Sequence, residues 1–126
     1  MSHRLLSIVE LGGYANFNSL YQQLGFSVEV ENSMRKAIKT LKKTQPKVVV
    51  AEFNFQSDFR DRSSSLESLL AAVQWMSETR VIVFYDKEWL EKLEKLLEVH
   101  TVFETLTFPI NETQLTDALT RAIEEE

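Results

Sequence analysis

The sequence predicts an α/β protein in which one five-stranded parallel sheet lies between two layers of helices. Strand-like and helix-like segments alternate five times along the 126 residues. Helical stretches of about 10–15 residues separate the strands, which is the spacing of βαβ units. The run of three valines at 48–50 is apolar on both faces, as a central strand of a parallel sheet must be. No repeat, linker or low-complexity segment interrupts the pattern, so we expect residues 1–126 to form one domain.

The expected strands are short apolar runs, and their surroundings distinguish edge strands from central ones. In the second strand, polar and apolar residues alternate from Ser27 to Val30, which predicts a strand at the edge of the sheet. Pro46 ends the helix before the third strand, because proline cannot continue a helix. The five strands are expected at 5–9, 27–30, 47–52, 80–85 and 101–107.

The expected helices carry apolar residues at helical spacing, and several have recognisable ends. Gly25 follows the first helix, where a left-handed backbone is common. Asn32 or Ser33 caps the second helix, and Asn111 with Gln114 forms a capping box for the last one. The apolar faces of the five helices lie within 14–24, 34–41, 66–76, 89–97 and 115–123.

Composition excludes several classes of function. The net charge of −5 argues against a nucleic-acid-binding surface, which requires clustered Lys and Arg. The chain has no cysteine, so disulfides, thiolate metal sites and a cysteine nucleophile are excluded. No apolar stretch approaches the roughly 20 residues of a membrane span. We therefore expect a soluble, cytoplasmic protein that binds neither nucleic acid nor membrane.

One basic cluster stands out against this acidic balance. Helical spacing places most of the cluster on one face of the second helix. This pattern predicts a solvated face, and the alternative is a docking patch. The cluster consists of Arg35, Lys36, Lys39, Lys42, Lys43 and Lys47.

Glu52 is the candidate site residue whose position says most, because it closes the third strand. In parallel α/β sheets, ligands gather beyond the carboxyl ends of the strands. Glu10 follows the first strand and is itself followed by Leu11, so two carboxylates are expected at this edge without a third acid. A hard divalent cation needs more oxygen ligands, so we expect no metal and no cofactor. The pair Gly12-Gly13 lacks the remaining residues of a phosphate-cradling loop.

The order and lengths of these segments resemble the receiver domain of bacterial two-component response regulators. The resemblance also rests on Pro46 one residue before the third strand, on the carboxylate that ends this strand, and on Phe108-Pro109 after the fifth strand. It implies a flavodoxin-like (βα)5 three-layer sandwich with strand order 2-1-3-4-5. It also implies a signalling function that is exerted through protein partners.

Receivers are phosphorylated on an aspartate, and most positions that serve this chemistry are altered here. Glu52 takes the phosphoacceptor position, where its additional methylene displaces the oxygen by an amount that can cost about a hundredfold in rate. Phe108 takes the place of a lysine that neutralises the developing charge. The hydroxyl position after the fourth strand falls on Tyr85 or Asp86. The resemblance therefore implies a degenerate receiver, or pseudo-receiver, with Glu10, Tyr85 and Asp86 as a residual acidic pocket.

We interpret the chain as a signalling module that binds proteins and is not an enzyme. In receivers, the face formed by the fourth helix, fifth strand and fifth helix pairs with partners. Trp89 and Phe103 fall near this face, so a homodimer or a complex with a signalling protein or output domain is expected there. Phe55 and Phe59 make the loop after the third strand a second candidate docking element.

Three alternatives stay open from the sequence. Asp58 or Asp61 in this loop could accept a phosphoryl group instead of Glu52. The domain could also be a flavodoxin-like module that binds a small molecule. Glu52 itself either mimics a phosphorylated aspartate or is simply a polar strand end.

Overall fold

The computed structural model describes residues 3–14, 16–53 and 65–124, and they form a five-stranded parallel sheet covered by helices. The strand order is β2-β1-β3-β4-β5, and every neighbouring pair is parallel. The predicted α/β class and flavodoxin-like order are therefore confirmed. The strands are β1 His3–Ile8, β2 Phe26–Glu31, β3 Val48–Glu52, β4 Arg80–Tyr85 and β5 Glu104–Thr107.

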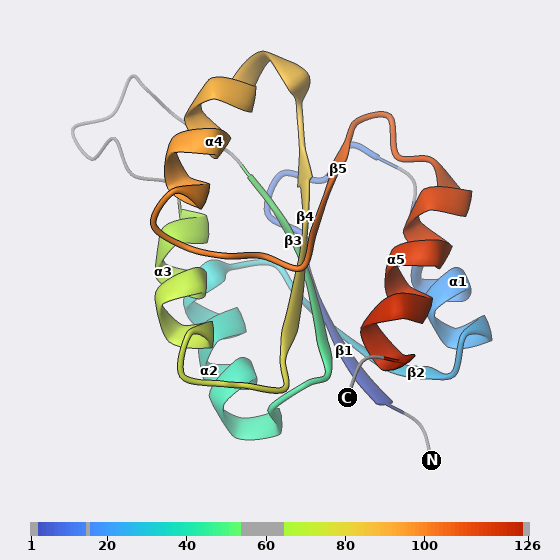
Figure 1. The fold of residues 1–126 in the computed structure, drawn as a ribbon. Coiled ribbons are helices and arrows are strands. Elements are labelled where there is room, and N and C mark those ends of the chain that lie inside the picture. Colours follow the sequence, from blue (N-terminus) through green and yellow to red (C-terminus); the bar gives the residue numbers. More distant parts are fainter. Residues whose placement is uncertain (1–2, 15, 54–64, 125–126) are drawn as a thin grey trace.

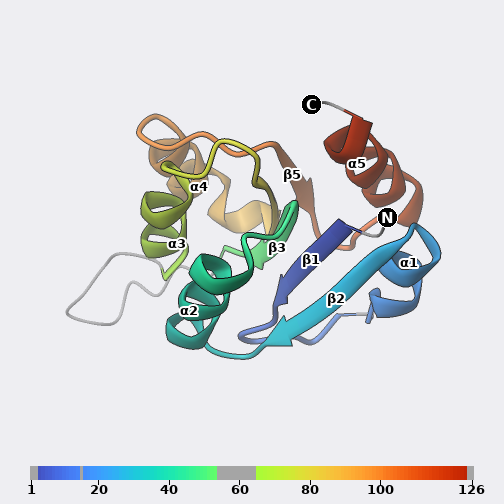
Figure 2. The ribbon, with the colours of Figure 1, turned by 90° about the horizontal axis from the view of Figure 1, so that it is seen from below.

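Two layers of helices sandwich the sheet, as Figures 1 and 2 show. One layer contains α2, α3 and α4, and the other contains α1 and α5. A short 3₁₀ helix, η1, leads directly into α4. The helices are α1 Asn18–Gln23, α2 Met34–Thr44, α3 Ser65–Val73, η1 Lys87–Trp89, α4 Leu90–Leu97 and α5 Glu112–Glu124.

The central strand β3 joins the two apolar cores on either side of the sheet. All five of its residues are buried. Because side chains alternate along a strand, Val49 and Ala51 pack with α2, α3 and α4, whereas Val48 and Val50 pack with α1 and α5. Glu52 continues the second series, which directs its side chain toward the α1 side of the sheet edge.

The predicted helix ends are confirmed where a cap can be recognised. Gly25 has a φ of +94° after α1, as a left-handed residue should. The Ser33 hydroxyl accepts a hydrogen bond from the Lys36 amide at 3.1 Å, which makes Ser33 the cap of α2. The neighbouring Asn32 side chain instead donates to the Val9 carbonyl at 3.0 Å. The Asn111 side chain accepts from the Gln114 amide at 3.0 Å at the start of α5.

The first helix and the fifth strand are shorter than predicted. Strand β5 begins only at Glu104. Helix α1 begins at Asn18, because the Asn16 side chain accepts a hydrogen bond from the Asn18 amide at 2.8 Å and organises the turn there. Before this turn, Gly12 and Gly13 have φ of +68° and +82°, which is left-handed backbone. Tyr14, predicted on the helix, therefore lies in the loop at the sheet edge. No helix in the described ranges is long and apolar enough to cross a bilayer.

Candidate functional site

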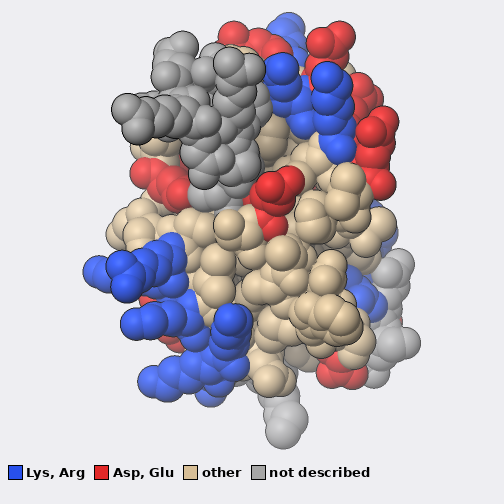
Figure 3. Space-filling view, turned by 90° about the vertical axis from the view of Figure 1, so that its left-hand side faces the viewer, with Lys and Arg blue, Asp and Glu red and all other residues tan. Residues whose placement is uncertain are grey.

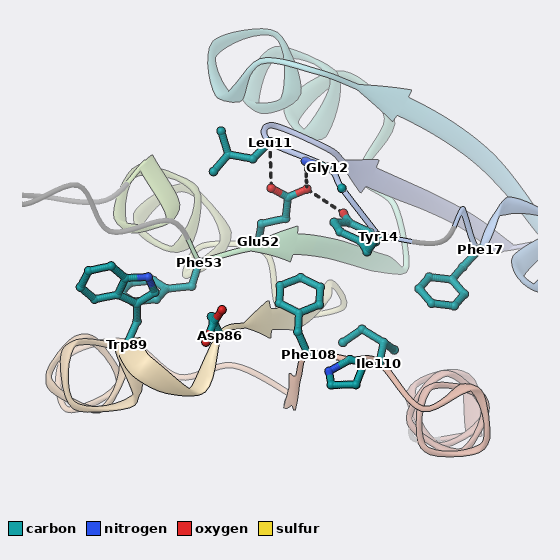
Figure 4. A pocket seen from close by; sticks show the side chains of 12 residues that line it. Leu11, Gly12, Tyr14, Phe17, Glu52, Phe53, Asp86, Trp89, Phe108 and Ile110 are labelled. Atoms are coloured by element: carbon teal, nitrogen blue, oxygen red, sulfur yellow. Dashed lines mark hydrogen bonds between the residues drawn. The ribbon is translucent and has the colours of Figure 1, made fainter.

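The carboxylate of Glu52 is buried and bound by the loop that follows β1. Only 2% of the Glu52 surface is exposed. The Leu11 amide donates to Oε1 at 3.0 Å, and the Gly12 amide donates to Oε2 at 3.3 Å. The Tyr14 hydroxyl donates to Oε2 at 2.7 Å, as Figure 4 shows. Three donors from one loop thus converge on a single carboxylate.

This arrangement explains how a carboxylate can be buried at the end of β3. Removing a carboxylate from water is costly unless hydrogen bonds replace the lost hydration, and bonds to a charged acceptor are stronger than neutral ones. The two amides are adjacent in the chain, and Gly12 has the left-handed φ of +68° that lets the loop turn directly after them. Burial raises the pKa of the Tyr14 hydroxyl, and the hydrogen bond to Glu52 and the charge of Glu52 raise it further. Tyr14 therefore stays protonated and donates.

An aromatic cluster surrounds Tyr14 at the same edge. The Tyr14 ring lies 5.2 Å from the Phe108 ring and 5.6 Å from the Phe84 ring, centroid to centroid. Phe84 and Phe108 meet edge to face at 5.9 Å. These spacings are typical of favourable aromatic pairs. The cluster connects the loop after β1 to the ends of β4 and β5.

Above this edge lies a pocket of about 670 Å³. The side chains that line it are mostly apolar, and Figure 4 shows them gathered around Glu52 and Asp86. Its described lining includes two carboxylates and no Lys or Arg. The aromatic residues that line it are Tyr14, Phe17, Phe53, Trp89 and Phe108.

Several solved structures that resemble this fold are receiver domains or response regulators. The receiver domain protein from Clostridium thermocellum has a TM-score of 0.77 and 18% identity, covering 97% of this chain and 94% of its own. The chemotaxis protein CheY4 from Vibrio cholerae has a TM-score of 0.75 and 17% identity, covering 97% and 99%. The response regulator from Desulfuromonas acetoxidans has a TM-score of 0.71 and 21% identity, covering 98% of each chain. The fold is that of a receiver domain.

At these identities the likeness concerns the receiver fold alone. No family model matches the sequence, and no curated protein matches it. The functional interpretation of this receiver fold therefore depends on the residues at the sheet edge.

The predicted residual acidic pocket is only partly assembled. Of Glu10, Tyr85 and Asp86, only Asp86 lines the pocket next to Glu52. Tyr85 is half-buried against the core under α2, α3 and α4, because side chains alternate along β4 and its neighbour Phe84 occupies the other face. The acidic pocket of the sequence prediction is therefore corrected to the pair Glu52 and Asp86.

The residues predicted to make protein contacts fall in different places. Trp89 lines the pocket, beside Phe53. The guanidinium groups of Arg80 and Arg121 lie over the Phe103 ring, 5.9 Å and 5.5 Å from its centroid. Side chains of the same chain thus cover part of the Phe103 ring. The loop residues Phe55, Phe59, Asp58 and Asp61 lie outside the described residues.

The residues at this edge do not fit the Mg²⁺ site that a receiver fold implies. No group of three His, Cys, Asp or Glu side chains that could hold a metal occurs among the described residues. Both Glu52 oxygens already accept hydrogen bonds. The position after Glu10 is Leu11, whose side chain is 69% exposed and supplies no oxygen ligand. Mg²⁺ sites usually combine one or two carboxylates with several waters, and here three hydrogen-bond donors of the same chain already occupy the Glu52 carboxylate.

Tyr14 is the site residue that the sequence prediction missed. Its apolar spacing with later residues suggested a helix, although the preceding pair Gly12-Gly13 signals a turn. The turn moves Tyr14 out of the helical register and toward β3. The glycine pair was therefore the sequence signal that could have placed Tyr14 at the site.

Proposed function

We propose that this protein is a receiver-fold signalling module that binds a protein partner without being phosphorylated. The proposal rests on the hydrogen bonds that the Glu52 carboxylate already accepts from its own chain. In an active receiver the equivalent side chain must be available as a nucleophile. Here its two oxygens accept hydrogen bonds from Leu11, Gly12 and Tyr14.

The surroundings of Glu52 also lack the charges that phosphoryl transfer needs. A transferred phosphoryl group carries several negative charges, which metal ions and an ammonium group neutralise in the transition state. At the position before Pro109, the ring of Phe108 packs on Tyr14 and carries no charge. A phosphoryl group at this edge would instead meet the negative charges of Glu52 and Asp86.

The hydrogen bonds of Glu52 favour a single state of the module. Receiver switching depends on loops at this edge having two arrangements. Glu52 connects β3 to the loop after β1 through three hydrogen bonds, so this loop is held in one arrangement without any modification. A constitutive binding surface is the function that this geometry supports best.

Intact-mass spectrometry after incubation with acetyl phosphate and Mg²⁺ tests the proposal. We expect no added species of about 80 Da, the mass of a phosphoryl group, in the wild type. The variant Glu52→Asp should also stay unmodified, because the lysine and the second acid are still lacking. A receiver of known activity, treated identically, provides the positive control.

A stoichiometric adduct on the wild type would overturn the proposal. Peptide mapping would then locate the modified residue. An adduct on Asp58 or Asp61 would establish the loop alternative, whereas an adduct on Glu52 would show that its hydrogen bonds open readily.

The pocket supports small-molecule binding as a second candidate. Its size lies within the roughly 300–1,000 Å³ of ligand pockets, and it lies at the carboxyl edge of the sheet, where such folds bind ligands. Two lining carboxylates disfavour the phosphate groups of nucleotides and flavins. A thermal-shift screen should therefore show no stabilisation by these anions. Stabilisation by a flavin or nucleotide would make the pocket a cofactor site.

A further inference from the structure

Helix α2 carries a concentrated positive charge in an acidic protein. It has five cationic residues and no acidic one, whereas the whole chain has a net charge of −5. All five side chains are exposed, and none forms an ion pair with another described residue. In Figure 3, Lys and Arg side chains gather at the lower left, beside a broad face without charge. The five are Arg35, Lys36, Lys39, Lys42 and Lys43.

An apolar hollow lies between this helix and α3. It measures about 530 Å³, and α2 contributes Ile38 and Lys42 to its lining. Ile38 and Met76 are partly buried against the core beneath. Ala71 and Ala72 supply small side chains from α3, which leave room above them.

Trp75 borders this hollow and is the most exposed large apolar side chain in the described ranges. Its exposed fraction is 83%. Tryptophan is enriched among the residues that dominate binding energy at protein interfaces. Trp75 falls within the range 66–76 that was expected to contain the apolar face of the third helix. The structure instead places it on the surface just beyond α3.

Some cations of α2 lie on the side of the helix that faces the hollow, and others lie on the far side. Residues three or four apart share one side of a helix, so Arg35 lies on the same side as Ile38 and Lys42. Lys36 and Lys43 point away from this side by the same geometry. The hollow therefore has a positive rim along α2 and an apolar wall at Trp75.

We propose that this surface, the α2–α3 groove, binds an acidic amphipathic helix of a partner protein. Apolar side chains of that helix would cover Trp75 and fill the hollow above Ala71 and Ala72. Its acidic residues would face Arg35 and Lys42. Complementary charge of this kind steers association and fixes the orientation of the bound helix.

Other occupants fit the α2–α3 groove less well. A second copy in a two-fold dimer would bring the same patch onto itself and place two five-cation helices together. Helix α5 carries Glu112, Asp117 and Glu124. It lies on the opposite face of the sheet from α2 and α3 (Figure 1), so it does not cover the groove of its own chain. Nucleic acid would use the cations but would leave the apolar hollow without a complement.

The inference rests on the proposed function, because it names the partner class of the same module. Trp75 provides a direct optical probe, since the chain has two tryptophans and the variant Trp89→Phe leaves Trp75 alone. The ligand is a synthetic helical peptide with Glu on one face and Leu and Phe on the other. We expect saturable binding with a shift of the Trp75 emission to shorter wavelength. Added salt should weaken this binding.

Matched charge reversals distinguish the groove from a general attraction to a basic helix. The double variant Arg35→Glu with Lys42→Glu should weaken peptide binding by about tenfold or more. The control Lys36→Glu with Lys43→Glu changes the net charge equally but on the far side of α2, and it should change the affinity by less than about threefold.

Several results would overturn the inference. These are no emission change up to millimolar peptide, equal binding of the same peptide with Lys replacing Glu, equal losses in the two double variants, or tighter binding of an oligonucleotide. None of them alters the acetyl phosphate result, so a failed groove leaves the proposed lack of phosphorylation standing. Conversely, phosphate uptake with intact peptide binding would overturn the proposed lack of phosphorylation and leave the α2–α3 groove standing.

Discussion

The sheet edge around Glu52 and the α2–α3 groove differ in the sign of their charges and in whether those charges are buried. At the sheet edge, a negative charge is buried and receives three hydrogen bonds from its own chain. On α2, five positive charges are exposed and form no ion pair with described residues. In receivers the first region is where chemistry is expected, yet here it is internally satisfied. The exposed charges lie beside the groove that we propose as the docking surface.

Removing the carboxylate of Glu52 should have the largest effect on stability among the changes at the sheet edge. Glu52→Ala leaves the Leu11 and Gly12 amides and the Tyr14 hydroxyl without their acceptor. Since hydrogen bonds to a charged group contribute about 1.5–3 kcal/mol, we expect the free energy of unfolding to fall by about 3 kcal/mol in urea denaturation. Glu29→Ala, at an exposed position on the edge strand β2, should change it by less than about 0.5 kcal/mol. An unchanged free energy of unfolding in Glu52→Ala would mean that the Glu52 hydrogen bonds make no net contribution to stability.

Replacing Trp75 should affect binding and leave stability alone. Because its side chain is largely in water, Trp75→Ser should change the free energy of unfolding by less than about 0.5 kcal/mol. The affinity for the acidic peptide, measured by calorimetry, should fall about tenfold, as expected for an interface anchor. The buried contrast in α3 is Leu69→Ala, which should cost about 2–4 kcal/mol of stability. A large loss of stability in Trp75→Ser would remove Trp75 from the proposed groove and return it to the core.

Tyr14→Phe removes a single donor from the Glu52 network. We expect a loss of about 1 kcal/mol in the free energy of unfolding, by urea denaturation at neutral pH. The pKa of Tyr14 is raised by burial and by Glu52, so the folded protein holds the phenol proton above pH 10, where the unfolded chain releases it. The contribution of Tyr14 is thus complete below about pH 10 and is lost as the pH rises further.

The alkaline loss should therefore be shallower in Tyr14→Phe than in the wild type. Tyr21, whose pKa is also raised by burial, keeps part of the slope in both proteins. Identical slopes in the two proteins would show that Tyr14 ionises as easily in the folded state as in the unfolded chain.

The smallest effect on peptide binding is expected at Phe103, which tests the face predicted from the receiver resemblance. Phe103 is partly buried against the core under α1 and α5, so Phe103→Glu should cost about 1–2 kcal/mol, which the nearby Arg80 and Arg121 guanidinium groups offset in part. Peptide binding should stay within about twofold of the wild type. Sedimentation at high concentration gives the oligomeric state in parallel. If the wild type is a dimer that Phe103→Glu dissociates, the face of α4, β5 and α5 is an interface in addition to the groove.

Local features of the sequence determined most of the fold. The apolar run of β3 identified the central strand, and the bounds of β4 agree with the expected 80–85. Ser33 and Asn111 cap helices at predicted positions, because a cap involves residues only two or three apart in the chain. The position of Glu52 at the end of β3 was predicted for the same reason, since a strand end is a local property.

The partners of Glu52 and the exposure of Trp75 were decided only by the tertiary structure. The three donors lie 38 to 41 residues before Glu52, so their approach depends on the pairing of β1 with β3 and on a left-handed turn at Gly12. Trp75 follows apolar residues at helical spacing, but α3 ends at Val73, and the chain beyond this end no longer faces the core. Hydrophobic periodicity predicts which face of a regular element is buried. It contains no information on how distant segments meet, or on where an irregular segment directs its side chains.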